Sequence, residues 1–194
     1  MNINKKLFFY LMSMTFLIDG NMGPQGFGAH ENHYFVETGT FRGDGIRKAM
    51  LCNFKEIISL EFDQNLFLAV KPQFEQPNIK IHLANSSKDL WAIIKPLNKK
   101  ITFWLDAHSW PPRKDGGKNC PLIEELKQIG RHHIKNHTIL IDDMHCADTI
   151  LFDFLSKDDL KAAIWKINPN YKICYVPGGD DGEYPQNVMV AFIE

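Results

Sequence analysis

Short apolar runs alternate with amphipathic segments along most of the chain. Five runs rich in β-branched and aromatic residues are each followed by a segment whose apolar residues recur at helical spacing. The predicted strands are residues 34–37, 56–62, 79–84, 101–106 and 138–141, and the predicted helices are 45–53, 65–74, 88–97, 121–132 and 149–167. Two further apolar runs, 172–176 and 188–193, have a connection rich in Gly and Asp between them and no helical segment.

This regular alternation predicts a parallel sheet with helices on both of its faces. Continuous apolar strands such as Ile139-Leu140-Ile141 fit burial on both sides. The two final strands lack an intervening helix, so we expect them to form an antiparallel hairpin at one edge. The predicted fold is a doubly wound, Rossmann-like α/β domain spanning residues 31–194, with a mostly parallel seven-stranded sheet.

The first 30 residues differ from the rest of the chain. Lys5 and Lys6 precede an apolar run from Leu7 to Ile18, which is the outline of a secretory or targeting signal. The alternative is an amino-terminal helix packed on the domain. Residues 20–30 contain four glycines and a proline, and this composition predicts a linker.

Composition narrows the range of partners. The 194 residues have a formal net charge of -1, and Lys and Arg are scattered along the chain. No basic field exists to hold nucleic acid, so nucleic acid is not an expected partner. Contact with a membrane is expected only if the amino-terminal segment is an anchor. The four cysteines show no spacing typical of a zinc site.

Polar side chains follow five of the predicted strands. In doubly wound folds the carboxyl ends of the parallel strands form one rim, and ligands bind there. The residues at these ends are Glu37 with Gly39, Glu61 with Asp63, Asn85 with Ser86 and Ser87, Asp106 with His108, and Asp142 with Asp143 and His145. We therefore expect acidic and amide groups to gather at one edge of the sheet.

The segment from residue 37 to residue 45 has glycines at turn positions. Gly39 allows a tight turn close to a ligand, Thr40 lies in the same loop, and Gly43 precedes the next helix. The segment does not match the GxGxxG fingerprint. Glu61 ends the second strand, where an acid accepts hydrogen bonds from both hydroxyls of a ribose. Nucleoside binding is the functional interpretation, and ordinary turn glycines with a solvated acid are the alternative.

The segments VETGTFRGDG, ISLEFD, ANSS, WLDAH and LIDDMH, in this order, resemble the class I S-adenosylmethionine-dependent methyltransferases. The resemblance extends from about Tyr34 to the end of the chain, including the closing hairpin. It implies S-adenosylmethionine as the cofactor. It also implies that Glu37 and Gly39 lie under the methionine part, that Glu61 takes the ribose, and that Ser86 and Ser87 lie near the adenine.

Asp106, Asp142 and Asp143 follow two neighbouring strands of the predicted sheet. Three carboxylates so placed can converge on a hard cation such as Mg²⁺. The arrangement is similar to that of the cation-dependent catechol-type and macrocin-type O-methyltransferases. That resemblance implies a metal that binds the oxygens of the substrate and lowers the pKa of a hydroxyl. The alternative is that Asp142 or Asp143 caps the segment that follows.

Two histidines lie within two residues of these acids. His108 and His145 could each serve as a general base, as a further metal ligand, or as loop residues with no role. With Asp106 and Asp142, His108 makes up the predicted catalytic group. In the loop of residues 109–120, Trp110 is a candidate for stacking on a substrate ring. Arg113 and Lys114 in that loop are candidates for contact with an anionic substrate, or solvated charges.

The main hypothesis is methyl transfer from S-adenosylmethionine to an oxygen of a small hydroxylated molecule, a sugar among the candidates. The alternatives are a nucleoside-binding module without turnover and a metal-dependent hydrolase that uses the same acids. The hydrolase would not need the pocket around Glu37 and Glu61. The methyltransferase hypothesis implies a cytoplasmic protein and a signal segment implies an exported or membrane-associated one. The sequence decides neither this nor the oligomeric state.

Overall fold

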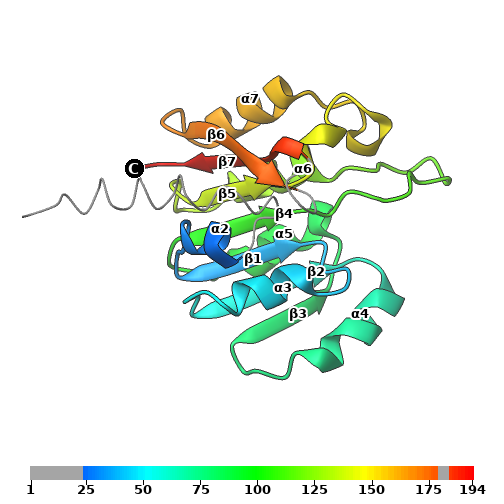
Figure 1. The fold of residues 1–194 in the computed structure, drawn as a ribbon, viewed down its shortest axis with the longest axis vertical. Helices are drawn as coiled ribbons and strands as arrows, with labels where there is room; N and C mark the ends of the chain where they lie inside the picture. Colours follow the sequence, from blue (N-terminus) through cyan, green and yellow to red (C-terminus); the bar gives the residue numbers. More distant parts are fainter. Residues whose placement is uncertain (1–23, 179–183) are drawn as a thin grey trace, which may run out of the picture.

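The computed structural model describes residues 24–178 and 184–194, so the apolar run from Leu7 to Ile18 lies outside the described residues. Seven strands form one sheet in the order β3-β2-β1-β4-β5-β7-β6 (Figure 1). They are β1 (Tyr34–Thr38), β2 (Glu56–Glu61), β3 (Ile79–Leu83), β4 (Ile101–Leu105), β5 (Thr138–Ile141), β6 (Lys172–Gly178) and β7 (Tyr184–Phe192). Within the described ranges, no helix has the length and apolar content needed to cross a bilayer.

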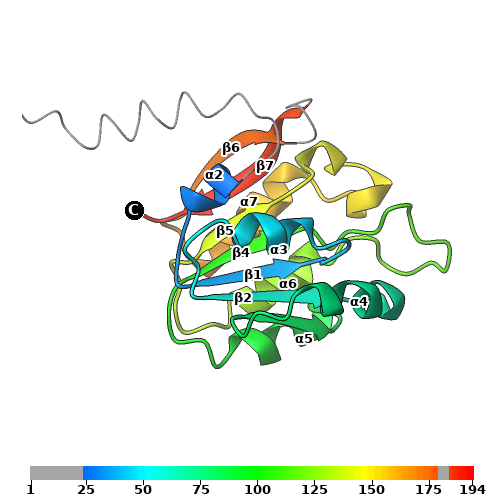
Figure 2. The same cartoon turned by 60° about the horizontal axis from the view of Figure 1, so that its bottom comes forward.

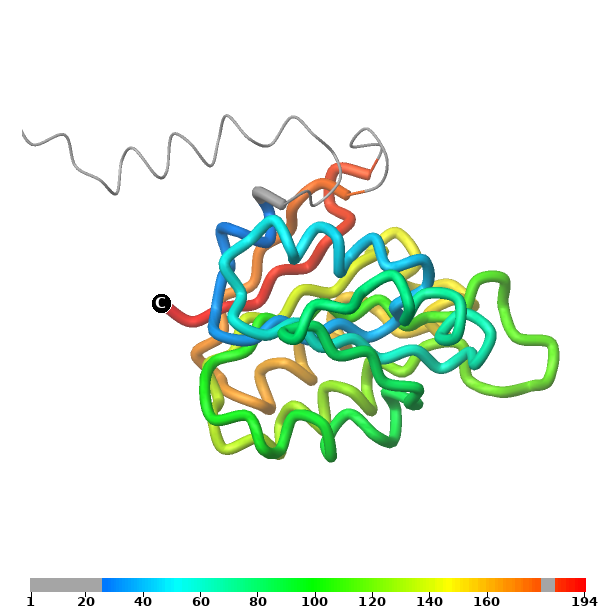
Figure 3. The backbone as a smooth tube through the Cα atoms, turned by 90° about the horizontal axis from the view of Figure 1, so that it is seen from below, coloured from blue at the N-terminus to red at the C-terminus, as the bar shows by residue number. Residues whose placement is uncertain are grey.

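Helices cover both faces of the sheet, as the edge-on view makes clear (Figure 3). One face carries α2 (Pro24–Gly28), α3 (Asp44–Ala49) and α4 (Gln64–Val70), and the other carries α5 (Ser86–Ile94), α6 (Leu122–Ile129) and α7 (Lys157–Ile167). Single 3₁₀ turns are η1 (Lys71–Gln73), η2 (Met144–Cys146) and η3 (Ile150–Phe152). The predicted doubly wound α/β fold is confirmed.

The pairing of the strands is parallel except at one edge. β1 pairs with β2 and β4, and the outer pairs β2–β3 and β4–β5 are also parallel. β7 runs antiparallel to both β5 and β6. The predicted closing hairpin is therefore confirmed, and its second strand lies inside the sheet, between β5 and β6.

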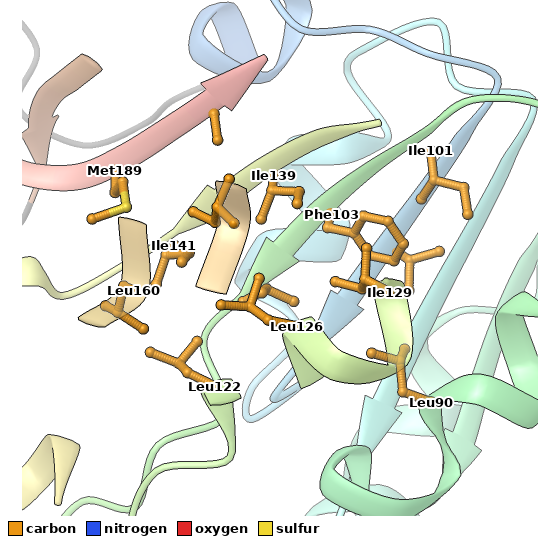
Figure 4. Packing of buried hydrophobic residues seen from close by; sticks show 14 of the residues in the cluster. Leu90, Ile101, Phe103, Leu122, Leu126, Ile129, Ile139, Ile141, Leu160 and Met189 are labelled. Carbon is orange, nitrogen blue, oxygen red and sulfur yellow. The ribbon is translucent and has the colours of Figure 1, made fainter. Parts of the chain in front are cut away.

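Alternation along the strands divides the core into two halves. The half on the side of α5, α6 and α7 includes Val36, Phe103, Leu126 and Leu160. Figure 4 shows part of this half. Phe35 belongs to the other half of the core, with α2, α3 and α4. Each fully buried apolar side chain of this size stabilises the fold by about 1.5–3 kcal/mol, so these continuous apolar strands are stable only when covered on both faces.

The predicted linker is wrong in part. Residues 24–28 form the short helix α2, and Phe27 is completely buried. Its ring centroid lies 5.0 Å from those of both Phe35 and Trp104. The glycine content of this segment suggested a linker, but one buried aromatic residue is enough to fix a short helix against the sheet.

The predicted long helix of residues 149–167 is also wrong in its first half. Asp153 and Phe154 have left-handed backbone conformations, with φ of 51° and 61°, which end the turn η3. The helix α7 then begins after Ser156, whose hydroxyl accepts a hydrogen bond from the backbone N–H of Asp159 in a capping box. Helical apolar spacing runs through this break, so the spacing alone did not reveal it.

Two histidines form a buried pair at the amino-terminal edge of the sheet. The backbone N–H of Ile101 donates to Nδ1 of His137 at 3.1 Å, and Nε2 of His137 lies 3.0 Å from Nδ1 of His132. Nε2 of His132 lies 2.9 Å from the carbonyl oxygen of Leu97. These contacts require Nε2–H on both rings, so both histidines are neutral. Burial, together with the neighbouring His132, lowers the pKa of His137 to about 3.

We expect His137 to make the fold sensitive to acid. Below pH 6.5 the unfolded chain protonates this histidine and the folded chain does not until about pH 3, so stability falls as the pH falls through this window. In His137→Asn the amide oxygen can still accept from Ile101, but the titrating ring is gone. Between pH 6 and 4, the wild type should lose about 1.4 kcal/mol more per pH unit than the variant.

The measurement is urea unfolding at pH 8, 6, 5 and 4. The free energy of unfolding of each protein at pH 8 is its own reference, because His137 is neutral there in both the folded and the unfolded chain. Equal pH slopes for the two proteins would contradict the assignment.

Candidate functional site

The candidate site lies at the carboxyl ends of β1 and β4, at the centre of the sheet. The connection after β1 leads through α3 to β2 on one side, whereas β4 lies on the other side and is followed by α6 on the opposite face. A crevice at such a switch in strand order is where doubly wound folds bind ligands. The β1 and β2 arrows point toward the side from which the green loop of residues 109–120 projects (Figure 2).

Gly39 brings the loops after β1 and β4 into direct contact. A Cβ atom at this position would lie 2.3 Å from the carbonyl oxygen of Asp106 and 3.0 Å from Cα of Ala107. Its φ of 85° also favours glycine. Gly39 therefore allows the loop after β1 to approach the backbone that carries Asp106, and its predicted approach to a ligand stays a prediction.

Glu37 is buried at the end of β1 and belongs to a chain of hydrogen bonds. Its Oε2 accepts from the Ser59 hydroxyl at 2.5 Å, and that hydroxyl lies 2.6 Å from the Thr40 hydroxyl. A Cβ atom on Gly45 would lie 1.8 Å from Oε1, so the carboxyl group packs directly against the backbone of the first turn of α3. Burial raises the pKa of Glu37 to about 8, despite the hydrogen bond from Ser59.

Glu61 holds the same loop from the end of β2. Its Oε2 accepts from the backbone N–H of Phe41 and its Oε1 from that of Asp63, both at 2.8 Å. The side chain is 5% exposed. Each oxygen keeps one lone pair for a further donor, so the acid both shapes the loop and can bind a hydroxyl.

A cavity of about 130 Å³ joins the glycine loop to the acids after β4 and β5. Its walls are formed by Phe27, Glu37, Gly39, Thr40, Phe41, Arg42, Asp44, Gly45, Lys48, Trp104, Asp106 and Asp142. Lys48 and Trp104 were not predicted as site residues. Trp104 lies in the WLDAH segment but at an apolar strand position, and Lys48 lies on α3, so only the fold brings the two side chains to one cavity.

A wider groove adjoins this cavity between α3 and α4. It measures about 480 Å³ and shares Phe41, Arg42 and Asp44 with the cavity. The guanidinium of Arg42 lies 5.1 Å above the centroid of the Phe41 ring. The two spaces therefore meet at the residues that follow Gly39.

Ser86 and Ser87 are the first two residues of α5, two positions before the predicted helix start. Asn85 caps this helix, and its Oδ1 accepts from both the N–H and the hydroxyl of Ser87. Ser86 is buried, and its carbonyl accepts from Gln128. Neither serine is among the residues that line the described cavity.

Beneath Ser86 lies an acid that the sequence analysis did not single out. Glu125 of α6 is completely buried, and burial raises its pKa to about 7. Its carboxyl group faces the hydroxyls of Thr38 and Ser86 without completing a hydrogen bond to any described residue. Its helix spacing marks it only as a polar residue in an amphipathic helix.

Three side chains at this rim offer ligand atoms within 4.8 Å of one another, and they are Asp106, His108 and Asp143. Nδ1 of His108 lies 3.7 Å from Oδ1 of Asp106, and Nε2 lies 3.6 Å from Oδ2 of Asp143. Burial raises the pKa of Asp106 well above its usual value, and the charges of Asp142 and Asp143 raise it further. Burial lowers the pKa of His108.

Asp142 lies beside this group of three, in the wall of the cavity. Its Oδ1 accepts from the backbone N–H of Asp143 at 2.8 Å and from Nδ2 of Asn187 at 3.2 Å. Burial and the charge of Asp143 raise its pKa to about 7. Asp143, with φ of 56°, precedes the turn η2 and makes no side-chain cap, so it does not act as the cap considered above.

Asn187 and Tyr184, both on β7, complete the rim and were not predicted. Asn187 donates to Asp142 and Asp143, and its Oδ1 lies 2.6 Å from Nδ1 of His145. The His145 ring stacks on Tyr184 at 4.1 Å with a 9° angle between the planes. No local motif surrounds Asn187, and only the antiparallel insertion of β7 brings it here.

The loop of residues 109–120 is attached at its base and exposed at its tip. Asn119 donates to Asp153 and to the carbonyl of Ile150, and so links the loop to the segment after β5. Trp110 is 78% exposed. Arg113 pairs with Asp115 within the loop, and Lys114 is exposed.

The sequence matches no protein-family model and no curated protein sequence. The fold is similar to that of solved structures. An O-methyltransferase from Bacillus cereus in complex with S-adenosylhomocysteine (SAH) has a TM-score of 0.59 and 11% identity, over 87% of this chain and 78% of that chain. An SAH-bound methyltransferase from Podospora anserina has a TM-score of 0.56 and 14% identity, over 88% and 76%.

The similarity is not limited to methyl transfer. A spermidine synthase in complex with a transition-state analogue has a TM-score of 0.55 and 14% identity, over 84% of this chain and 55% of that chain. At sequence identities this low, the structural similarity establishes the fold alone, and the chemistry has to be argued from the residues of the site. The chain has the Rossmann-like fold of the class I S-adenosylmethionine-dependent methyltransferases.

Proposed function

We propose that this protein transfers a methyl group from S-adenosylmethionine to an oxygen of a small hydroxylated molecule, with a divalent cation bound beside the acceptor. One observation carries the proposal. One cavity is lined both by the glycine loop after β1 and by Asp106 and Asp142, so the acids lie beside the place where the glycine loop would hold a cofactor. A hydrolase that used only the acids would leave the glycine loop and Glu61 without a role.

The residues present fit the cofactor. Gly39 and Gly45 let the backbone pack against Asp106 and Glu37, which holds both acids beside the cavity. The buried carboxyl of Glu37 suits the ammonium of the methionine part, and Glu61 has lone pairs left for a ribose. The resemblance implies that Ser86 and Ser87 contact the adenine. Both residues form the first turn of α5, so we propose that they serve the start of this helix.

The donor set also fits a hard divalent cation. Asp106, Asp143 and His108 present two carboxylates and one imidazole within reach of a single ion, and waters or acceptor oxygens would complete its shell. Such a cation supplies charge that lowers the pKa of an acceptor hydroxyl. Asp142, which lies in the cavity wall outside this group of three, is the proposed proton acceptor.

In the proposed step, the O–H bond of the acceptor breaks and its proton goes to Oδ2 of Asp142. S-adenosylmethionine, held by Glu37 and Glu61, would supply the methyl group to that oxygen and would leave as SAH. The chain contributes mainly by holding the two reactants in line, because positioning removes most of the entropic cost of a reaction between two molecules.

Glu61→Gln should weaken the binding of SAH at least tenfold. The amide has only one oxygen, so it cannot accept from Phe41, from Asp63 and from a ribose as the carboxylate can. Isothermal titration calorimetry of the purified chain with SAH measures the effect. Glu56→Gln is the matched control, because Glu56 lies at the other end of β2 and pairs with Lys80 at the surface.

The control variant should bind SAH as the wild type does. Absence of SAH binding by the wild type would overturn the cofactor half of the proposal. Equal binding by Glu61→Gln and the wild type would remove Glu61 from the cofactor site.

Glu37 predicts that SAH binding strengthens as the pH rises. Because burial raises the pKa of Glu37 to about 8, the carboxyl is neutral below that pH in the empty protein. An ammonium group favours the ionised form, so binding there must release a proton. The dissociation constant should fall by up to about tenfold per pH unit between pH 6 and 8 and then level off.

In Glu37→Gln the amide can still accept from Ser59 but has no proton to lose. Its SAH affinity should be weaker and nearly constant between pH 6 and 8. A wild-type affinity that does not change over this range, or the same slope in both proteins, would contradict a contact between Glu37 and the ammonium.

A further inference from the structure

Asn187 is a buried amide that links Asp143 of the candidate metal group to Asp142 and His145, which lie beside that group. Its Nδ2 donates to Oδ1 of Asp142 at 3.2 Å and to Oδ1 of Asp143 at 3.1 Å. Its Oδ1 lies 2.6 Å from Nδ1 of His145. The residue is 1% exposed. Its amide therefore bonds only to groups at the rim of the site, and bulk water does not compete with those bonds.

The chemistry of this position calls for an amide. Asp142 and Asp143 need donors, His145 needs an acceptor, and a primary amide supplies both from one planar group. An aspartate here would add a further negative charge to the acids. A leucine would fill a similar volume and provide no hydrogen bond.

The backbone fixes the place of this amide. β7 pairs with β5 through Ile141 opposite Met189, which brings residue 187 beside the end of β5. Across the hairpin stands Gly178, where a Cβ atom would lie 2.7 Å from Cβ of Asn187. The glycine leaves the space that the asparagine occupies.

The two hydrogen bonds decide which carboxylate oxygens remain for other partners. Asn187 takes Oδ1 of Asp142 and Oδ1 of Asp143. The other oxygen of Asp143, Oδ2, lies 3.6 Å from Nε2 of His108, inside the group that includes Asp106. Without the amide, two adjacent carboxylates would turn away from each other.

We propose that Asn187 is a positioning residue that orients Asp143 for a divalent cation and holds Asp142 beside it. It binds one oxygen of each acid and so directs the Oδ2 of Asp143 toward Asp106 and His108. The inference rests on the proposed function in one respect, namely that a cation binds at this group. Mutation of an outer-shell residue that holds a metal ligand in place typically lowers the metal affinity tenfold to hundredfold.

Direct binding of Mn²⁺ to the purified full chain, monitored by electron paramagnetic resonance, tests this inference. Asn187→Leu should raise the Mn²⁺ dissociation constant by about tenfold or more. Its SAH affinity should stay within twofold of the wild-type value, because Asn187 does not line the described cavity. A general loss of structure would weaken the binding of Mn²⁺ and of SAH together. Weaker Mn²⁺ binding with unchanged SAH binding therefore identifies a positioning role.

The matched control is Asn32→Leu. Asn32 donates to Thr102 at 3.0 Å, to Thr138 at 3.1 Å and to the carbonyl of Ile101, at the opposite edge of the sheet. This variant loses a comparable set of hydrogen bonds but should keep the wild-type Mn²⁺ affinity. If Asn187→Leu does not fold, Asn187→Ser is smaller than the native residue and keeps one donor, and it should weaken Mn²⁺ binding in the same direction.

If the folded Asn187→Leu variant binds Mn²⁺ with wild-type affinity, the inference is overturned and the proposed cation site is unaffected. Equal weakening in Asn32→Leu would also overturn it, because the effect would then be general. If the wild type itself binds no Mn²⁺, the inference fails together with the cation half of the proposed function. The SAH titration still reports separately on the cofactor half.

Discussion

The crowding of carboxyl groups at one end of the sheet is the constraint on which the site depends. Parallel strands deliver their acids to the same rim, and burial there raises the pKa of three of them. Acids so close together persist only when protons, donors or cations offset their charge. The chain provides the Ser59 hydroxyl, the Asn187 amide and the positive charge of Lys48. A divalent cation would extend the same compensation.

Local pattern was sufficient for the sheet and insufficient for the segments that tertiary contacts decide. The strands were predictable because an apolar run buried on both faces is a property of neighbouring residues. The segment after β5 was not predictable, since the left-handed Asp153 is held by Asn119 and Cys120, more than 30 residues away. In the helix α2, Phe27 is completely buried although the composition of the stretch is that of a linker.

The same distinction applies to the site. Glu61 and Asp106 could be placed at the ends of β2 and β4 because the end of an apolar strand is a local property of the sequence. Asn187 was not found, since its partners lie 44 and 45 residues away and its own surroundings carry no motif. Ser86 and Ser87 were located correctly along the chain, but the helix that starts there engages them, which only the capping hydrogen bonds reveal.

The two edges of the sheet respond to acid in opposite directions. At the carboxyl edge, the folded protein takes up protons before the unfolded chain does, so acidification from about pH 8 favours the fold through groups such as Glu37. At the amino-terminal ends of the strands, His137 of the folded protein is not protonated until about pH 3, so acidification destabilises the fold. The two effects offset each other only while the rim acids can protonate. A ligand that keeps those acids ionised removes one side of this balance, and the occupied protein then loses stability more steeply as the pH falls.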